Sequence, residues 1–145
     1  MITHHQLVSL NTESGIHLSD ITPQIAQIIV DSGVSHGIAT INSLHTTLAL
    51  TVNEMEERLL QDIDNYFSKL VPADQGYLHD DLHLRDVPED EPENAHSHLI
   101  AMMLGNSESI AVVDSTLVLG AYQSVMAVEL DGPRERRISV QVIGC

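Results

Sequence analysis

The chain contains no tryptophan, one phenylalanine and one cysteine. With so few aromatic rings, its core must be built from leucine, isoleucine, valine, alanine and methionine side chains. The only cysteine is the last residue, Cys145, so no disulfide can form within the chain. This cysteine usage agrees with a reducing compartment.

Basic residues are also scarce, because six lysines and arginines stand against 21 aspartates and glutamates, for a formal net charge of −15. Such a negative surface repels phosphate backbones, so we expect no nucleic-acid partner. An anionic substrate would need a cation or a local arginine cluster to approach. Arg134, Arg136 and Arg137 form the only such cluster. It either binds a phosphate group or pairs with nearby acidic residues.

Long apolar runs are missing too. No run reaches the roughly 18 residues needed to cross a bilayer, and the first residues lack the basic start and apolar block of a signal peptide. We therefore expect a cytoplasmic protein with no membrane partner. A chain of 145 residues can bury a core without a metal or a disulfide, so we expect a single domain over residues 1–145.

The apolar pattern predicts about three helices and several antiparallel strands. The helices are expected at residues 22–33, 55–70 and 94–104. Strands are expected at 5–10, as a pair over 37–53, and at 109–113, 116–119, 123–130 and 138–142, the last four as an antiparallel meander. This order of elements favours an α+β fold in which about three helices cover packed antiparallel β-sheets.

The connection over residues 73–93 is long, polar and rich in proline and acidic residues. Connections of this length are either functional or disordered. We expect an acidic, flexible flap at about residues 82–93, centred on the run from Asp86 to Glu93.

The stretch at residues 42–54 is expected to be one strand. Alternation on a strand would place leucines and Val52 on one face and a histidine with hydroxyl and amide groups on the other. A buried polar group without a partner costs about 1–3 kcal/mol. The polar face is therefore exposed to solvent, satisfied by neighbouring strands, or part of a site.

Histidines and carboxylates recur along the chain, at His45, at 79–83 and at His96 and His98. Imidazole suits zinc-like ions, whereas carboxylate suits magnesium or manganese. No local spacing is a metal signature by itself. His96 and His98 would point about 200° apart on a helix, so at most one of them reaches a given site.

Five segments carry a resemblance in their order and spacing. They are Ser43-Leu44-His45-Thr46-Thr47 with Thr51-Val52-Asn53-Glu54, Tyr77-Leu78-His79-Asp80-Asp81, Asn94-Ala95-His96-Ser97-His98-Leu99, Gly120-Ala121-Tyr122-Gln123, and Asp131-Gly132-Pro133-Arg134. Together they resemble the YjbQ family of small proteins, the UPF0047 group, over nearly the whole chain. Two departures are Tyr122, where the family usually has tryptophan, and the longer acidic flap at 86–93.

The resemblance implies an α+β fold, a homotrimer and a weak thiamine-phosphate synthase activity. The family's histidines fall on His45, His79 and His98, which become candidate ligands of a divalent metal, either a zinc-like ion or Mg²⁺. Its acidic and polar positions fall on Glu54, Asp62, Asp80, Asn53 and Gln123. Candidate catalytic residues are Glu54, Asp80, Asn53 and Gln123, and candidate phosphate-binding residues are Arg134, Thr46 and Thr47.

The implied reaction joins a pyrimidine diphosphate to a thiazole phosphate, and the thiazole nitrogen displaces pyrophosphate. The leaving diphosphate requires charge neutralisation by Mg²⁺ and arginine, with Asp80, Asp81 and Glu54 as candidates to hold the ion. One alternative is a zinc-type hydrolase in which the three histidines hold the metal and Glu54 or Asp80 is the general base. Another is a non-catalytic trimer that binds a metal or a small phosphorylated molecule.

Overall fold

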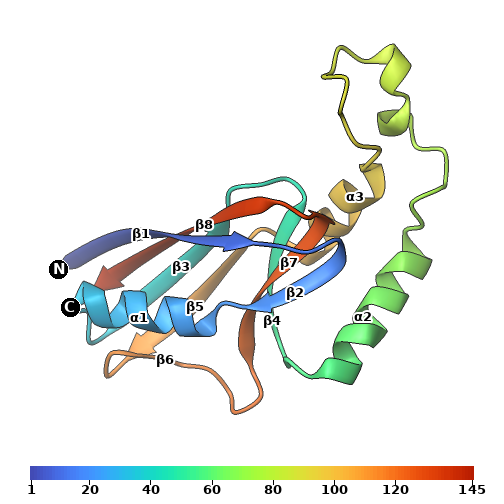
Figure 1. Cartoon of the computed structure of the whole chain (residues 1–145). Helices are drawn as coiled ribbons and strands as arrows, with labels where there is room; N and C mark the ends of the chain where they lie inside the picture. The colour runs from blue at the N-terminus through green and yellow to red at the C-terminus, as the bar shows by residue number, and fades with distance from the viewer.

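The computed structural model describes residues 1–145 and contains two antiparallel sheets and three α-helices (Figure 1). It confirms the predicted α+β class. The elements are β1 (Ile2–Asn11), β2 (Gly15–Asp20), α1 (Thr22–Ser32), β3 (Gly37–Ser43), β4 (Leu48–Asn53), α2 (Glu57–Leu70), the short 3₁₀ helices η1 (Leu78–Asp80) and η2 (Leu82–Leu84), α3 (Ala95–Leu104), β5 (Ser107–Val113), β6 (Thr116–Leu117), β7 (Ser124–Gly132) and β8 (Glu135–Gly144).

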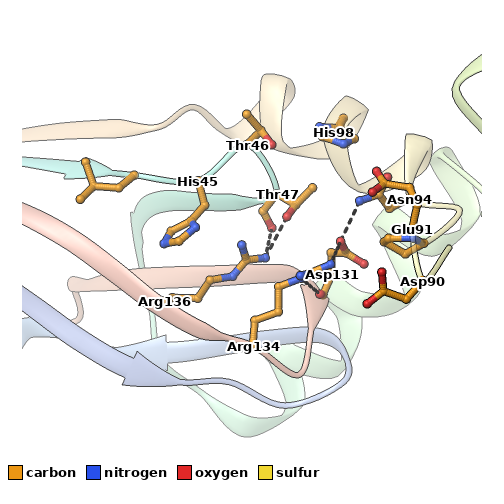
Figure 2. A pocket seen from close by; sticks show the side chains of 12 residues that line it. His45, Thr46, Thr47, Asp90, Glu91, Asn94, His98, Asp131, Arg134 and Arg136 are labelled. Atoms are coloured by element: carbon orange, nitrogen blue, oxygen red, sulfur yellow. Dashed lines mark hydrogen bonds and ion pairs between the residues drawn. The ribbon is translucent and has the colours of Figure 1, made fainter. Parts of the chain in front are cut away.

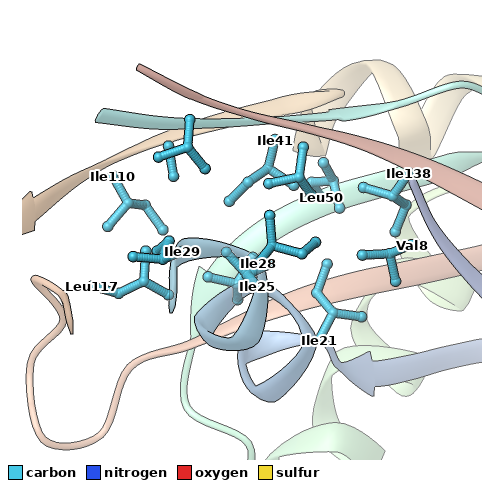
Figure 3. Close-up of a cluster of buried hydrophobic side chains, with 14 of the residues drawn as sticks. Val8, Ile21, Ile25, Ile28, Ile29, Ile41, Leu50, Ile110, Leu117 and Ile138 are labelled. Carbon is cyan, nitrogen blue, oxygen red and sulfur yellow. The ribbon is translucent and has the colours of Figure 1, made fainter. Parts of the chain in front are cut away.

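The two sheets pack face to face. The larger sheet has the strand order β1-β8-β3-β5-β6, and the smaller has the order β2-β7-β4. Between them lies a cluster of 18 buried aliphatic residues, to which α1 adds Ile25, Ile28 and Ile29 (Figure 3). The core is therefore aliphatic, as the scarcity of aromatic residues requires.

The smaller sheet has a second buried face. There Met126 and Val128 of β7 pack with Ile100 of α3, and Leu60 and Phe67 of α2 lie against this cluster. Strand β7 is thus covered on both sides, which explains why it reads as a continuous apolar run. The outer face of the larger sheet has no covering element and leaves Ile38 and Ile143 exposed.

The three predicted helices are present, with small differences at their starts. Helix α1 ends at Gly33, whose φ of 71° lies in the left-handed region. Its N-cap position is Ile21, and the hydroxyl of Thr22 accepts a hydrogen bond from the backbone N–H of Val125. Helix α2 begins at Glu57 because the side chain of Glu56 accepts two backbone N–H groups there.

The two strands predicted over residues 37–53 are present as β3 and β4. Other strand predictions were wrong in three places. Residues 42–54 do not form one strand, because β3 ends at Ser43 and β4 begins at Leu48 in the other sheet. Strand β2 was missed. The predicted meander is limited to the pairing of β5 with β6, since β7 enters the smaller sheet and β8 pairs with β1 and β3.

None of the helices combines the length and the apolar character needed to cross a bilayer.

Candidate functional site

A tight turn at residues 44–47 carries the chain from β3 in the larger sheet to β4 in the smaller one. The predicted alternation holds only after this turn, where Leu48 and Leu50 enter the core between the sheets and Ala49 faces the helices. His45, Thr46 and the following threonine therefore lie at the end of the sandwich, where the two sheets diverge.

Backbone groups of both sheets hold this turn. The N–H of Arg137, in β8, donates to Nε2 of His45 over 3.0 Å. The N–H of Leu130, in β7, donates to the carbonyl oxygen of Thr47 over 3.1 Å. Because Nε2 accepts a hydrogen bond, the proton of the neutral imidazole is on Nδ1. His45 thus has an N–H to donate and no lone pair to spare.

A buried ion pair lies beneath the turn. Arg136 of β8 donates through Nε and Nη2 to the two carboxylate oxygens of Glu129 in β7. Nη2 also donates to the hydroxyl of Thr47 over 2.8 Å. Glu129 accepts further hydrogen bonds from the hydroxyl of Thr12 and from two backbone N–H groups, of Leu130 and Asp131.

These contacts keep Glu129 ionised. Burial alone would raise the pKa of its carboxyl, but the hydrogen bonds from Arg136, Thr12 and the Asp131 backbone, with the charge of Arg136, lower the pKa below its ordinary value. The guanidinium of Arg136 is therefore held rigidly by a charged partner. Its Nη1 donates to no group of the chain, although the residue borders an open cleft.

The cleft has a volume of about 520 Å³ and is lined almost entirely by polar residues (Figure 2). Arg134 lies on one side, where it donates to the carbonyl and the carboxylate of Asp131. Asn94, at the start of α3, donates to the same carboxylate over 2.8 Å. The full lining is Leu44, His45, Thr46, Thr47, Asp90, Glu91, Pro92, Asn94, His98, Asp131, Arg134 and Arg136.

His98 reaches the cleft from the first turn of α3, and His96 does not line it. The ring of His98 meets that of His79 edge to face, with 4.8 Å between their centroids. Burial, and then the nearby charge of His79, lower the pKa of His98 below its ordinary value. Burial, and then the charge of Arg136, lower the pKa of His45 as well. Both imidazoles lining the cleft are therefore neutral near pH 7.

The three predicted metal-binding histidines do not form a metal centre within one chain. No group of three or more histidine, cysteine, aspartate or glutamate side chains is placed to hold an ion. His45 uses Nε2 to accept the Arg137 N–H. His79 has a buried Nε2 without a partner, so only the adjoining His79 and His98 keep nitrogen lone pairs for other contacts. These residues do not fit a three-histidine zinc site.

Three predicted catalytic residues lie at the opposite end of the smaller sheet. Asn53 ends β4 and pairs with Ser124 of β7. Glu54 follows Asn53 in the chain and Gln123 precedes Ser124, so the three residues lie at the same end of the sheet. At about 3.3 Å per residue, β4 separates them from the turn by about 16 Å. Gln123 accepts the N–H of Gly120, and Asn53 accepts the N–H of Glu54. The structure does not bring these three residues to the cleft.

The remaining predicted residues divide between cleft and scaffold. Arg134 and Thr46 line the cleft, as expected of phosphate-binding residues. Thr47 is buried, and its hydroxyl holds Arg136. Asp80, from η1, accepts the N–H of Ala95 over 3.0 Å and so fixes the start of α3. The predicted flap borders the cleft through Asp90 and Glu91.

Residue types alone did not reveal Glu129, and they placed Arg136 only in a basic cluster that either binds a phosphate or pairs with nearby acidic residues. A signal was present. Glu129 interrupts the apolar run of β7, and Arg136 precedes Ile138, Val140 and Val142 on the alternating positions of β8 that are buried. A carboxylate and a guanidinium on the apolar faces of successive strands indicate a buried pair.

The family profile described as "UPF0047 protein YjbQ-like" matches residues 6–145. The chain belongs to the YjbQ family. This confirms the resemblance drawn from the ordered motifs. A UPF0047 protein of Methanothermobacter thermautotrophicus is 38% identical over 144 residues, which cover 99% of this chain and 94% of that protein. Another, of Archaeoglobus fulgidus, is 37% identical over 136 residues, or 94% of this chain and 98% of that protein.

Solved structures of YjbQ-like proteins have the same fold. A YbjQ-like protein of unknown function from Sulfolobus solfataricus superposes with a TM-score of 0.88 at 35% identity, covering 99% of this chain and 98% of that one. A YjbQ/UPF0047 protein from Clostridium acetobutylicum gives a TM-score of 0.85 at 31% identity, covering 95% and 99%. The two-sheet architecture is therefore that of the YjbQ family.

Proposed function

We propose that this YjbQ protein binds a small phosphorylated molecule in the polar cleft and has a weak thiamine-phosphate synthase activity. In that transferase reaction a thiazole nitrogen displaces pyrophosphate from a pyrimidine diphosphate. The observation that carries the proposal is the guanidinium of Arg136, which Glu129 and Thr47 hold in place while its Nη1 has no partner within the chain, in a residue that lines the cleft together with Arg134. Donors that are already in place stabilise charge developing on a leaving group without reorganisation.

The cleft supplies several donors to an anion. Arg134 is exposed and keeps Nη1 free of contacts within the chain, since only its Nε and Nη2 bind Asp131. The hydroxyl of Thr46 and the Nδ1–H of His45 lie at the same opening. Arginine favours phosphate because its planar guanidinium can donate two parallel hydrogen bonds.

A divalent cation belongs to the proposal because the cleft also contains acidic groups. Asp90, Glu91 and Asp131 would repel a diphosphate that arrived alone. Magnesium usually binds through one or two carboxylates and the phosphates of its substrate, so these residues fit its donor preference. When bound, Mg²⁺ would neutralise charge on the leaving diphosphate.

The geometry favours this transferase over the zinc-type hydrolase. A hydrolytic zinc site needs about three protein ligands and an open position, whereas His45 has no lone pair to spare and no three donors converge. The other alternative, a trimer that binds a ligand without catalysis, would use the same cleft but carry out no reaction there. A phosphorylated ligand that binds without turnover would support it.

The proposal includes a homotrimer built on the outer face of the larger sheet. Ile38 lies opposite Ile143 on β8 and Ala111 on β5, and the next row contains Thr40, opposite Gln141. These rows carry no charged side chain in a chain whose net charge is −15. An open part of a sheet face without charged side chains suits contact with a second copy of the same face or its neighbour. A cytoplasmic location remains part of the proposal.

The test is product formation by the purified chain. We expect thiamine phosphate to accumulate when the pyrimidine diphosphate, the thiazole phosphate and Mg²⁺ are supplied. Arg134→Gln should lower kcat/KM by about tenfold or more, because one charge-assisted contact is lost. The matched control Arg58→Gln, on the exposed surface of α2, should leave the rate unchanged. Equal rates for the two variants, or no product at any enzyme concentration, would refute the synthase assignment.

A further inference from the structure

The polar cleft continues into a second, largely apolar hollow along α3. This apolar lobe has a volume of about 480 Å³ and shares three residues with the polar cleft, namely His45, Thr46 and His98. The rest of its lining is Leu48, Ala101, Met102, Gly105 and Asn106. Apart from the two histidines, no residue of this lining is ionisable.

We propose that the ring of the phosphorylated ligand lies in the apolar lobe, against Met102 and Ala101, while the polar cleft receives the phosphate. The inference rests on the proposed function, whose two substrates are both ring phosphates, and adds the part of the site that selects the ring. It assigns a specificity role to Met102 and Ala101, which the sequence motifs did not indicate. A simple phosphate or a sugar phosphate would leave the apolar lobe without a matching group.

The charge distribution supports this division. The polar cleft holds two arginines and three carboxylates, whereas the apolar lobe holds none in a chain with 21 acidic residues. Ligand sites commonly combine apolar walls with a few polar groups that fix orientation, in volumes of about 300–1,000 Å³. The two joined lobes follow this pattern, with the charged groups confined to one end.

The junction between the lobes also suits a heteroaromatic ring. His45 presents Nδ1–H there, since its Nε2 accepts the Arg137 N–H. His98 lines both lobes from α3 (Figure 2). Neutral imidazoles can stack on an aromatic ring or exchange a hydrogen bond with a ring nitrogen at low desolvation cost.

The exposure of Met102 indicates that this wall of the apolar lobe is a surface that can contact a ligand and is not part of the buried core. It is 83% exposed, whereas Ile100 of the same helix is 1% exposed and buried against the smaller sheet. An unbranched thioether adapts to flat ligands and makes favourable contacts with aromatic rings. The next residue, Met103, is 57% exposed and does not line the lobe, so it provides a matched control.

The experiment measures binding of three probes by isothermal titration calorimetry in the presence of Mg²⁺. The probes are the thiazole phosphate, the same thiazole alcohol without phosphate, and inorganic phosphate. We expect the thiazole phosphate to bind at least tenfold more tightly than either of the others. Met102→Ser should weaken binding of the thiazole phosphate at least fivefold and leave binding of inorganic phosphate unchanged. Met103→Ser should change neither affinity.

The outcomes separate this inference from the proposed function. Equal affinity for thiazole phosphate and inorganic phosphate, or equal affinities in the two serine variants, overturns the ring-binding lobe while an anion site at Arg134 stands. Failure of every phosphate to bind overturns both. If Met102→Ser instead lowers the native mass of the protein and leaves the ratio of affinities unchanged, a second copy covers the lobe and the inference is wrong.

Discussion

Glu129 and Arg136 face each other between the two sheets, with 0% and 3% of their surfaces exposed. Removing two charges from water costs several kcal/mol per ion, and their attraction offsets this cost only when the hydrogen bonds are complete. Here the carboxylate accepts bonds from Arg136, Thr12 and two backbone groups. The pair holds the floor of the cleft in one geometry, because the same guanidinium also binds Thr47.

Breaking this pair should strongly destabilise the fold. Glu129→Gln leaves the buried cation of Arg136 without a charged partner, so we expect the free energy of unfolding to fall by about 3–5 kcal/mol. The measurement is urea unfolding followed by circular dichroism. Glu135→Gln, on the exposed start of β8, is the control and should change stability by less than about 0.5 kcal/mol. A loss of similar size in both variants would contradict a special role for the pair.

The two imidazoles that line the cleft should titrate below the ordinary histidine pKa of 6.5. Burial is the main cause for both His45 and His98, and it lowers each pKa. The unfolded chain then binds more protons than the folded one just below pH 6.5, so these residues stabilise the fold fully above that value and progressively less as the pH falls. Imidazole NMR titration, assigned with His45→Gln and His98→Gln, measures the two midpoints. Midpoints at or above 6.5 would show that the rings are not desolvated.

At the scale of elements, α3 and the connection that precedes it determine where the cleft opens. The first turn of α3 is held from two sides, since Asp80 accepts the N–H of Ala95 and Asn94 donates to Asp131. Arg85 ties the connection together by donating to the carbonyl oxygen of His79. In Figure 1 this connection projects beyond the sheets, between α2 and α3. Its acidic part returns to the body of the protein where it borders the cleft.

Asp80 therefore has a structural task that can be separated from catalysis. Asp80→Ala removes the acceptor at the start of α3 and should cost about 1 kcal/mol in stability, whereas Asp80→Asn keeps an acceptor oxygen and should cost less. Asp81→Ala is the control. Thermal unfolding of the three variants gives the stabilities, and the synthase assay gives the rates. If Asp80→Asn keeps its stability but loses all product formation, the carboxylate acts in catalysis and the structural interpretation is insufficient.

At the scale of the whole molecule, helices cover one side and leave the other open. Helices α2 and α3 pack on the outer face of the smaller sheet, α1 closes the core between the sheets, and the outer face of the larger sheet stays bare. Exposed aliphatic residues such as Ile38 and Ile143 on this face cost solvation free energy in a monomer. Burial against other copies would recover it, as in the proposed homotrimer.

Charge placed on this face should separate the copies without unfolding them. Ile38 is 52% exposed in the single chain, so Ile38→Lys should change the stability of the fold little but should reduce the native mass from three chains to one. Val30, on α1, is 62% exposed, and Val30→Lys is the matched control that should keep the assembly. Native mass spectrometry measures the mass of the assembly formed by each variant. A monomeric unmodified protein, or an Ile38→Lys assembly of unchanged mass, would disprove an interface on this face.

Much of the local structure was predictable because it depends on residues close together in the chain. The apolar stripe of Ile25, Ile28 and Ile29 with Gly33 behind it predicted α1 within one residue of its observed end. By contrast, the turn at 44–47 was read as strand, since alternation continues on both sides of it. Which sheet each half enters depends on β7 and β8, far away in the sequence.

By itself the sequence determined the α+β class, the aliphatic core and three helices, because composition and short-range periodicity encode them, and its ordered motifs indicated the family. Only the tertiary structure decided which of the motif residues meet. Arg136 reaches Thr47 across 89 positions and Glu129 reaches Thr12 across 117, while Asn53 and Glu54, only a few residues past His45, end at the other end of β4. Side-chain chemistry is local to a residue, but proximity is set by how strands pair and sheets pack, which are long-range and cooperative.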